Sequence, residues 1–144
     1  MDTAERLARE VIAAFNDRDY ERTGTLVTAD FVDHGAPPWA PQGRQGYVEV
    51  LRFVGDVLRV RYELHDTVPD GDRVAIRATA HGLHTTDSLG FPATGRPYAM
   101  ATMHLYRADG DLLAEHWGVR DELSVLWQVG ALPPPEPMGF GVDG

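Results

Sequence analysis

The sequence contains no cysteine and no lysine among its 144 residues. The missing cysteines exclude disulfide bonds, a thiol nucleophile and thiolate metal sites, and the missing lysines exclude Schiff-base chemistry through a lysine amine. No stretch approaches the roughly 18 consecutive apolar residues of a membrane span, and the charged segment 1–10 lacks the apolar core of a signal peptide. We therefore expect a soluble, cytoplasmic protein that does not enter a membrane.

Basic residues are also scarce. The chain has 22 acidic and 13 basic residues, which gives a net charge of −9. Nucleic-acid binding needs clustered positive charge, so nucleic acid is not an expected partner. A length of 144 residues with 43% hydrophobic content is enough for one buried core. We predict one domain over residues 1–132 and a Pro/Gly-rich tail over residues 133–144.

Apolar residues in the first half of the chain recur at helical spacing. This pattern predicts amphipathic helices over residues 3–17 and 44–58, with a shorter helical segment over 19–27. Pro37 and Pro38 predict an irregular loop before the last of these helices.

The second half is rich in β-branched and aromatic residues that alternate with polar ones. Strands are predicted over residues 59–68, 73–85, 97–107 and 112–123, with turn signals around Gly71 and Gly110. Helices followed by a run of strands are typical of an α+β fold. We expect a curved antiparallel sheet packed against three N-terminal helices, which together enclose a cone.

The last predicted strand carries an acidic residue near its end. Alternation along an extended strand places Glu115, Trp117 and Asp121 on one face and His116 and Arg120 on the other. Burial beside an indole would raise the pKa of the Asp121 carboxyl and suit it to proton transfer near neutral pH. A structural ion pair at the strand end explains the same pattern, so both interpretations stay open.

Six short motifs along residues 3–132 carry a family resemblance through their order and spacing. They are Phe31-Val32-Asp33-His34, Gly43-Arg44-Gln45-Gly46-Tyr47, Ala93-Thr94-Gly95-Arg96, Met103-His104-Leu105-Tyr106-Arg107, the run Glu115-His116-Trp117 to Asp121, and Gln128-Val129-Gly130-Ala131-Leu132. In these motifs the chain resembles the SnoaL-like polyketide cyclases of the NTF2-like superfamily.

The resemblance implies a cone-shaped cavity that works without a metal or an organic cofactor. Asp121 falls at the position of the family's acid–base aspartate, which serves an intramolecular aldol ring closure of a β-keto polyketide. The implied partner is therefore a small, hydrophobic, polyketide-like substrate, and a homodimer is implied as well. The same cavity could serve an isomerase, a lyase, an epoxide-opening hydrolase or a noncatalytic small-ligand-binding module.

Two histidines are further candidates for catalytic residues in the cavity. His34 follows a short strand, where its ring could hydrogen-bond Asp121 or a substrate carbonyl, or else cap local backbone. A two-residue turn at Asp109-Gly110 would place His104 on the face of Asp121, whereas a three-residue loop would reverse its direction. The sequence leaves both questions open.

Five aromatic residues are candidates for the cavity wall. Trp117 shares the predicted face of Asp121, and Tyr98 pairs opposite Asp121 in the two-residue register. Trp39 lies in the proline-containing loop, while Phe15 and Phe53 lie on the apolar faces of two helices. None of the histidines has the spacing of a helical zinc site, so no metal is expected.

Overall fold

The structure is a computed structural model that describes residues 1–138, with only the main chain of Ser88. Its elements, in chain order, are α1 (Thr3–Asn16), α2 (Tyr20–Thr25), β1 (Val27–Asp33), α3 (Gly43–Arg52), the π-helical turn η1 (Phe53–Val57), β2 (Arg61–Asp70), β3 (Arg73–Leu83), the 3-10 turn η2 (Asp87–Leu89), β4 (Pro97–Asp109), β5 (Leu112–Arg120) and α4 (Glu122–Gln128).

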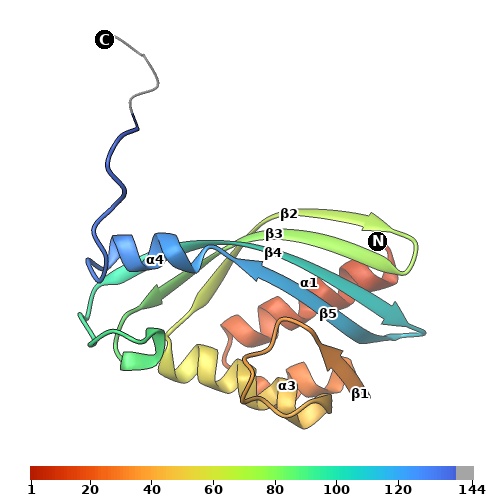
Figure 1. The fold of residues 1–144 in the computed structure, drawn as a ribbon. Helices are drawn as coiled ribbons and strands as arrows, with labels where there is room; N and C mark the ends of the chain where they lie inside the picture. The colour runs from red at the N-terminus through yellow and green to blue at the C-terminus, as the bar shows by residue number, and fades with distance from the viewer. Residues whose placement is uncertain (139–144) are drawn as a thin grey trace.

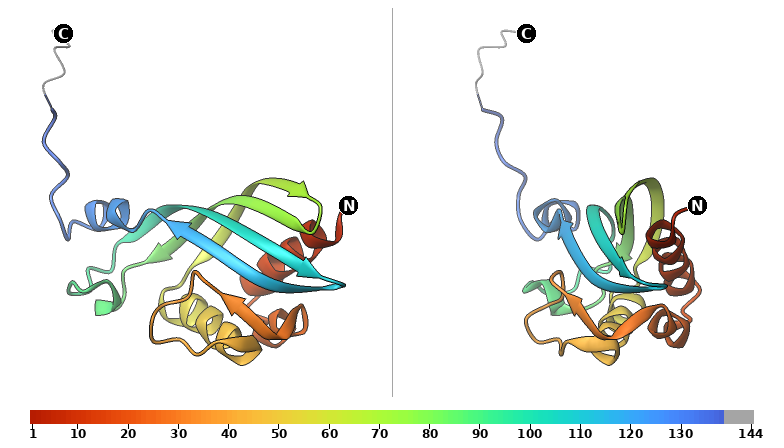
Figure 2. Two further views of the ribbon diagram at one scale, coloured as in Figure 1. Left: turned by 45° about the vertical axis from the view of Figure 1, so that its right-hand side comes forward. Right: turned by 90° about the vertical axis from the view of Figure 1, so that its right-hand side faces the viewer.

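The strands form one five-stranded sheet in the order β1-β5-β4-β3-β2. Strands β2 to β5 make the predicted antiparallel meander, and β1 adds a parallel edge strand beside β5. The sheet is strongly twisted and curves around α1 and α3 on one side (Figures 1 and 2). The α+β prediction with N-terminal helices against a curved sheet is confirmed, although the sheet is mixed rather than purely antiparallel.

The core lies between the concave face of the sheet and the helices. Alternate residues of β3 and β4, such as Val74, Ile76 and Tyr106, are buried against the apolar stripe of α1 that includes Leu7 and Phe15. Full burial of one such aliphatic or aromatic side chain stabilises the fold by about 1.5–3 kcal/mol. The alternate residues of the strands and the apolar face of α1 therefore pack together in one core.

The last strand ends earlier than the sequence predicts, at Arg120 rather than Leu123. Asp121 instead precedes α4, and its carboxylate accepts a hydrogen bond from the Ser124 backbone N–H at 3.2 Å. Aspartate is a favoured N-cap residue because its side chain satisfies an N–H of the first turn that has no partner within the helix. Gly130, with φ of +77°, follows the end of this helix in the left-handed conformation that glycine adopts without strain.

The β4–β5 hairpin decides the direction of His104. Asp109 pairs with Leu112 around a Gly110-Asp111 turn, and an irregularity after Arg107 shifts the pairing by one residue. Beyond the shift His104 pairs with Gly118. His104 therefore faces the interior on the same side as the even-numbered residues of β5, and not on the side predicted by a two-residue Asp109-Gly110 turn.

Residues 133–138 have no regular secondary structure and extend away from the sheet and helices (Figure 1). The rest of the predicted tail, residues 139–144, lies outside the described residues. Within residues 1–138 no helix has the length and apolar character needed to span a membrane.

Candidate functional site

A line of hydrogen-bonded polar side chains crosses the interior between β1, β5 and β4. Asp33 Oδ1 lies 2.7 Å from His116 Nδ1, and His116 Nε2 lies 2.9 Å from His104 Nδ1. His104 Nε2 lies 3.0 Å from the hydroxyl of Thr102, which donates to the Ala78 carbonyl at 2.7 Å. All four side chains are buried, so these hydrogen bonds take the place of water.

The directions of these hydrogen bonds fix where the protons are. The Thr102 hydroxyl uses its hydrogen for the Ala78 carbonyl, so His104 Nε2 must donate to it. In a neutral His104 the other nitrogen, Nδ1, then accepts from His116 Nε2. An ionised Asp33 accepts from His116 Nδ1. His116 therefore carries both ring protons and forms a charged pair with Asp33.

The pKa shifts of the neighbours agree with this assignment. Burial raises the pKa of Asp33, but the hydrogen bond and charge of His116, the Gly35 N–H and the charge of Arg120 outweigh burial and lower it overall. Burial, helped by the positive charges of His116 and Arg120, lowers the pKa of His104 to about 3. Near neutral pH Asp33 is thus a carboxylate and His104 a neutral imidazole.

Three tyrosines surround the same polar cluster. The hydroxyls of Tyr47 and Tyr106 lie 3.0 Å apart, and Tyr62 lies close enough to Arg120 to interact with its charge. Burial raises the pKa of Tyr47, Tyr62 and Tyr106 above the ordinary value. All three remain neutral phenols that can donate a hydrogen bond.

Two adjoining cavities lie at this cluster. The inner one, which we call the floor, has a volume of about 40 Å³ and is lined by Asp33, His104 and His116 among other residues. The outer one, which we call the chamber, has a volume of about 350 Å³. Both are lined by four shared residues, which we call the neck: Val50, Val54, Tyr62 and Arg120.

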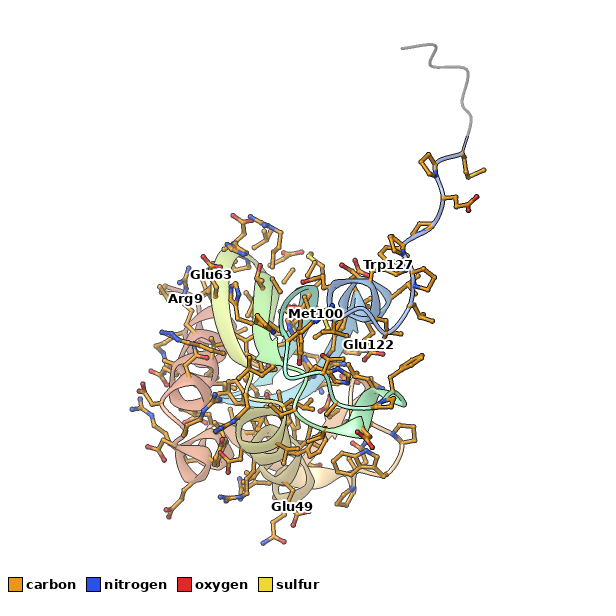
Figure 3. The ribbon with its side chains drawn as sticks, turned by 90° about the vertical axis from the view of Figure 1, so that its left-hand side faces the viewer. Arg9, Glu49, Glu63, Met100, Glu122 and Trp127 are labelled. Atoms are coloured by element: carbon orange, nitrogen blue, oxygen red, sulfur yellow. The ribbon has the colours of Figure 1, made fainter. Side chains whose placement is uncertain are left out.

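The chamber has mostly apolar walls. Figure 3 views the molecule from the end at which α4 lies, and labels Met100 on β4 and Glu122 on α4, two of the residues that line it. The other lining residues are Gly35, Ala36, Pro37, Pro38, Phe53, Leu58, Val60, Leu89, Tyr98 and Val125, in addition to the neck. A concave apolar space with a few convergent polar groups is the usual form of a small-molecule site.

The π-helical turn η1 supplies part of this wall. Phe53 and Val54 both line the chamber, and the ring of Trp39 packs edge-on against Phe53 at a centroid distance of 5.3 Å. Single π turns within helices are frequent at functional sites because they redirect side chains. Here the turn lies at the outer end of α3, where the chamber begins.

Asp121 and Trp117 do not take part in the interior site, and the prediction that Asp121 is desolvated beside Trp117 is wrong. Asp121 is exposed at the start of α4 and lines a shallow groove with Arg77 and Met103. Trp117 lies on the opposite face of β5 from His116, stacked on His34 at 4.9 Å. Because the pairing of β4 with β5 turns His116 inward, the face that carries Glu115 and Trp117 is the outer one.

His34 also lies on the outer face. Its Nε2 lies 2.7 Å from Glu115 Oε2, and the other carboxylate oxygen accepts from Arg107 at 3.0 Å. The predicted contact of His34 with Asp121 is therefore not present. The pairing of His34 with Glu115 and Trp117 is an outer-face cluster away from the cavity.

The other predicted site residues lie at or near the cavity. His104 and Phe15 line the floor, whereas Tyr98 and Phe53 line the chamber. Tyr98 pairs with Gly82 rather than with Asp121, and a methyl group on Gly82 would overlap the Tyr98 ring. Trp39 is largely exposed beside the chamber and touches it only through Phe53.

Sequence reasoning missed Asp33, His116 and Arg120. The sequence offers Asp33 only as a possible second carboxylate for epoxide hydrolysis, and alternation puts His116 and Arg120 on the face opposite Asp121. The alternation along β5 could have indicated the inner position of His116. Leu113 and Ala114 are both buried at an irregularity in the pairing, and beyond it the even-numbered residues continue the buried face. No group of three or more His, Asp or Glu side chains within residues 1–138 is arranged to hold a metal ion.

The model of the SnoaL-like polyketide cyclases matches residues 5–129. The chain belongs to this family. Aklanonic acid methyl ester cyclase DnrD of Streptomyces peucetius is 23% identical over 97% of the chain and 99% of its own length, and DauD of Streptomyces sp. (strain C5), of the same description, is 22% identical over 93% and 85%. These relatives span the whole domain.

Solved structures show the same SnoaL-like architecture. Wild-type IdmH from Streptomyces antibioticus, a candidate polyketide cyclase, is 31% identical with a TM-score of 0.76 over 88% of the chain and 98% of its own. TsrD from Streptomyces laurentii is 25% identical with a TM-score of 0.80 over 92% and 99%. The cone of sheet and helices is thus the family's fold, and its cavity is the place to look for a small polyketide-like substrate.

Proposed function

We propose that this protein is a cofactor-free cyclase that closes a ring by intramolecular aldol addition in a β-keto polyketide, with the Asp33–His116 pair as its acid–base group. The observation that carries the proposal is the buried Asp33–His116 hydrogen bond of 2.7 Å at the floor of an apolar cavity. The curated relatives DnrD and DauD, which are named as cyclases, support ring closure as the reaction class.

The free oxygen of Asp33 is the atom suited to receive a proton. Oδ1 accepts from His116 Nδ1 and from the Gly35 N–H, whereas Oδ2 has no hydrogen-bond partner among residues 1–138. In the proposed reaction Oδ2 takes the proton from a carbon between two carbonyls. The enolate carbon then attacks a second carbonyl, and the resulting alkoxide takes the proton back from Asp33.

His116 stabilises the carboxylate in the resting state and holds it in place. A carboxylate with a lowered pKa is a weak base, so proton removal needs further help. Two factors provide it: a carbon between two carbonyls is already acidic, and the Arg120 guanidinium and Tyr62 hydroxyl lie at the neck, where an enolate oxygen would form. Preorganised donors of this kind can contribute about 10²–10³ in rate.

The test compares Asp33→Asn with Asp121→Asn, since the second removes the carboxyl that the family resemblance favours. The substrate is aklanonic acid methyl ester, the compound in the relatives' names, and ring closure is followed by chromatography as a product of unchanged mass. We expect Asp33→Asn to lower kcat by about 10²–10⁴-fold and Asp121→Asn to leave it nearly unchanged. Loss of turnover in Asp121→Asn with retention in Asp33→Asn would transfer the role to Asp121.

A further inference from the structure

Arg120 occupies the point at which the chamber meets the floor. It belongs to the neck with Tyr62, Val50 and Val54, so its side chain borders both the chamber and the cavity that contains Asp33. Nη1 of Arg120 donates to the Gly35 carbonyl at 3.0 Å, and its charge acts on the neighbouring Tyr62 phenol. The contact with Gly35 holds the guanidinium in place without neutralising it.

The positive charge of Arg120 is not compensated by an ion pair. No carboxylate oxygen within residues 1–138 lies within 4.0 Å of its guanidinium nitrogens. Asp33 lies near enough to interact electrostatically, but its charge is matched by His116. Glu122 also lines the chamber but makes no ion pair with Arg120. Arg120 is therefore the one charged side chain of the neck, and no carboxylate is in direct contact with it.

A cation next to apolar surface is poorly solvated, and an anionic ligand relieves this cost. The guanidinium fork suits a carboxylate or an enolate because it can donate two hydrogen bonds to one anionic group. Burial raises the pKa of Tyr62 even though Arg120 opposes this effect, so Tyr62 stays a phenol and can donate a further hydrogen bond. The neck thus combines a fixed cation with a neutral donor.

We propose that Arg120 and Tyr62 form an anion-binding site that selects substrates with an anionic oxygen, either a carboxylate or an ionised enol or phenol, on a planar apolar body. The proposal deepens the proposed function and rests on the same cavity. The anionic oxygen binds at the neck, and the apolar body lies in the chamber, since the floor of about 40 Å³ has no room for a ring. A cavity of about 150 Å³ binds benzene, so the chamber of about 350 Å³ takes a body of about two fused rings.

The experiment measures binding of 2-naphthoate and of its neutral isostere 2-naphthamide by isothermal titration calorimetry. The two ligands fill the chamber alike and differ in charge. We expect the wild-type protein to bind 2-naphthoate about tenfold more tightly, the range given by hydrogen bonds to a charged group. Equal affinities, or no binding of 2-naphthoate, would overturn the proposal.

Variants locate the preference. Arg120→Met should remove the preference, so that 2-naphthoate binds no more tightly than 2-naphthamide. Arg107→Gln, which alters an arginine of the outer face, should keep the preference. Tyr62→Phe should weaken the preference and serves as the second variant if Arg120→Met does not fold, as judged by its thermal midpoint. A preference that persists in folded Arg120→Met contradicts the proposal.

Asp33→Asn separates this proposal from the proposed function. A variant that has lost turnover but still prefers 2-naphthoate supports both. Turnover retained in Asp33→Asn, together with a lost preference in Arg120→Met, would remove the acid–base proposal and leave the anion site in place.

Discussion

At the scale of single residues, the direction of each hydrogen bond in the interior depends on the next one along the line from Thr102 to Asp33. His104 accepts from His116 because its own Nε2 hydrogen is used for Thr102, which in turn is committed to a backbone carbonyl. Each bond in this line fixes the direction of the next. A change of one side chain should therefore alter the proton position several ångströms away, as expected of a connected buried network.

His104 should make the protein sensitive to acid. Its pKa is about 3 in the folded state against 6.5 ordinarily, so below about pH 6.5 the unfolded chain takes up a proton at His104 that the folded chain does not. Stability should fall as the pH is lowered through this range, by up to about 1.4 kcal/mol per pH unit. Urea denaturation at pH 7 and pH 5 measures the slope.

The matched comparison for this prediction uses two histidine variants. His104→Gln should make the pH dependence of stability shallower, whereas His81→Gln, which removes an exposed histidine beside Glu63, should leave most of it. An unchanged slope in His104→Gln would show that His104 is not the group that resists protonation.

Gly118 leaves the space that the paired histidines occupy. A methyl group at this position would lie 3.1 Å from His116 Cε1 and 3.4 Å from His104 Nδ1. Gly118→Ala should therefore displace the pair and cost about 1–3 kcal/mol, the usual range for overpacking. Val119→Ala, at the exposed neighbouring position, is the control in the same denaturation assay, and equal stability of the two variants would contradict the close packing.

At the scale of elements, the boundary between β5 and α4 decides which residues face the cavity. The strand ends at Arg120, so its side chain reaches the neck, while Asp121 turns away as the N-cap of α4. A strand that continued to Leu123 would have carried the acid into the sheet. The start of a short helix therefore separates the interior arginine from the exterior carboxylate.

Asp121→Ala should lower stability by about 1 kcal/mol because the capping hydrogen bond to Ser124 N–H is lost. Asp121→Ser keeps a capping oxygen and should recover most of that stability. Chemical denaturation compares the three proteins. A fall in turnover in both variants, without a matching fall in stability in the serine variant, would point to a chemical role of the carboxyl.

At the scale of the whole molecule, the sheet and the helices pack together without contribution from residues 133–138. Residues 133–138 are exposed, and they extend away from the body in Figure 1. Removal of residues 133–144 should therefore change the free energy of unfolding by no more than about 0.5 kcal/mol and leave naphthoate affinity unchanged. A larger loss of stability would place the domain boundary beyond Leu132.

The fold class follows from residue periodicity alone, because helical and strand periodicities in separate halves of the chain allow few arrangements other than helices against a meander. Periodicity also determined several apolar residues of the cavity, such as Phe15 and Phe53, since these lie on faces that must be buried.

Tertiary structure decided the polar site. Asp33 meets His116 across 83 residues of sequence only because β1 pairs in parallel with β5, and no local pattern carries that pairing. The one-residue shift after Arg107 turns His104 and His116 inward, since a single step in a strand exchanges its two faces. The end of β5 at Arg120 leaves Asp121 outside the strand.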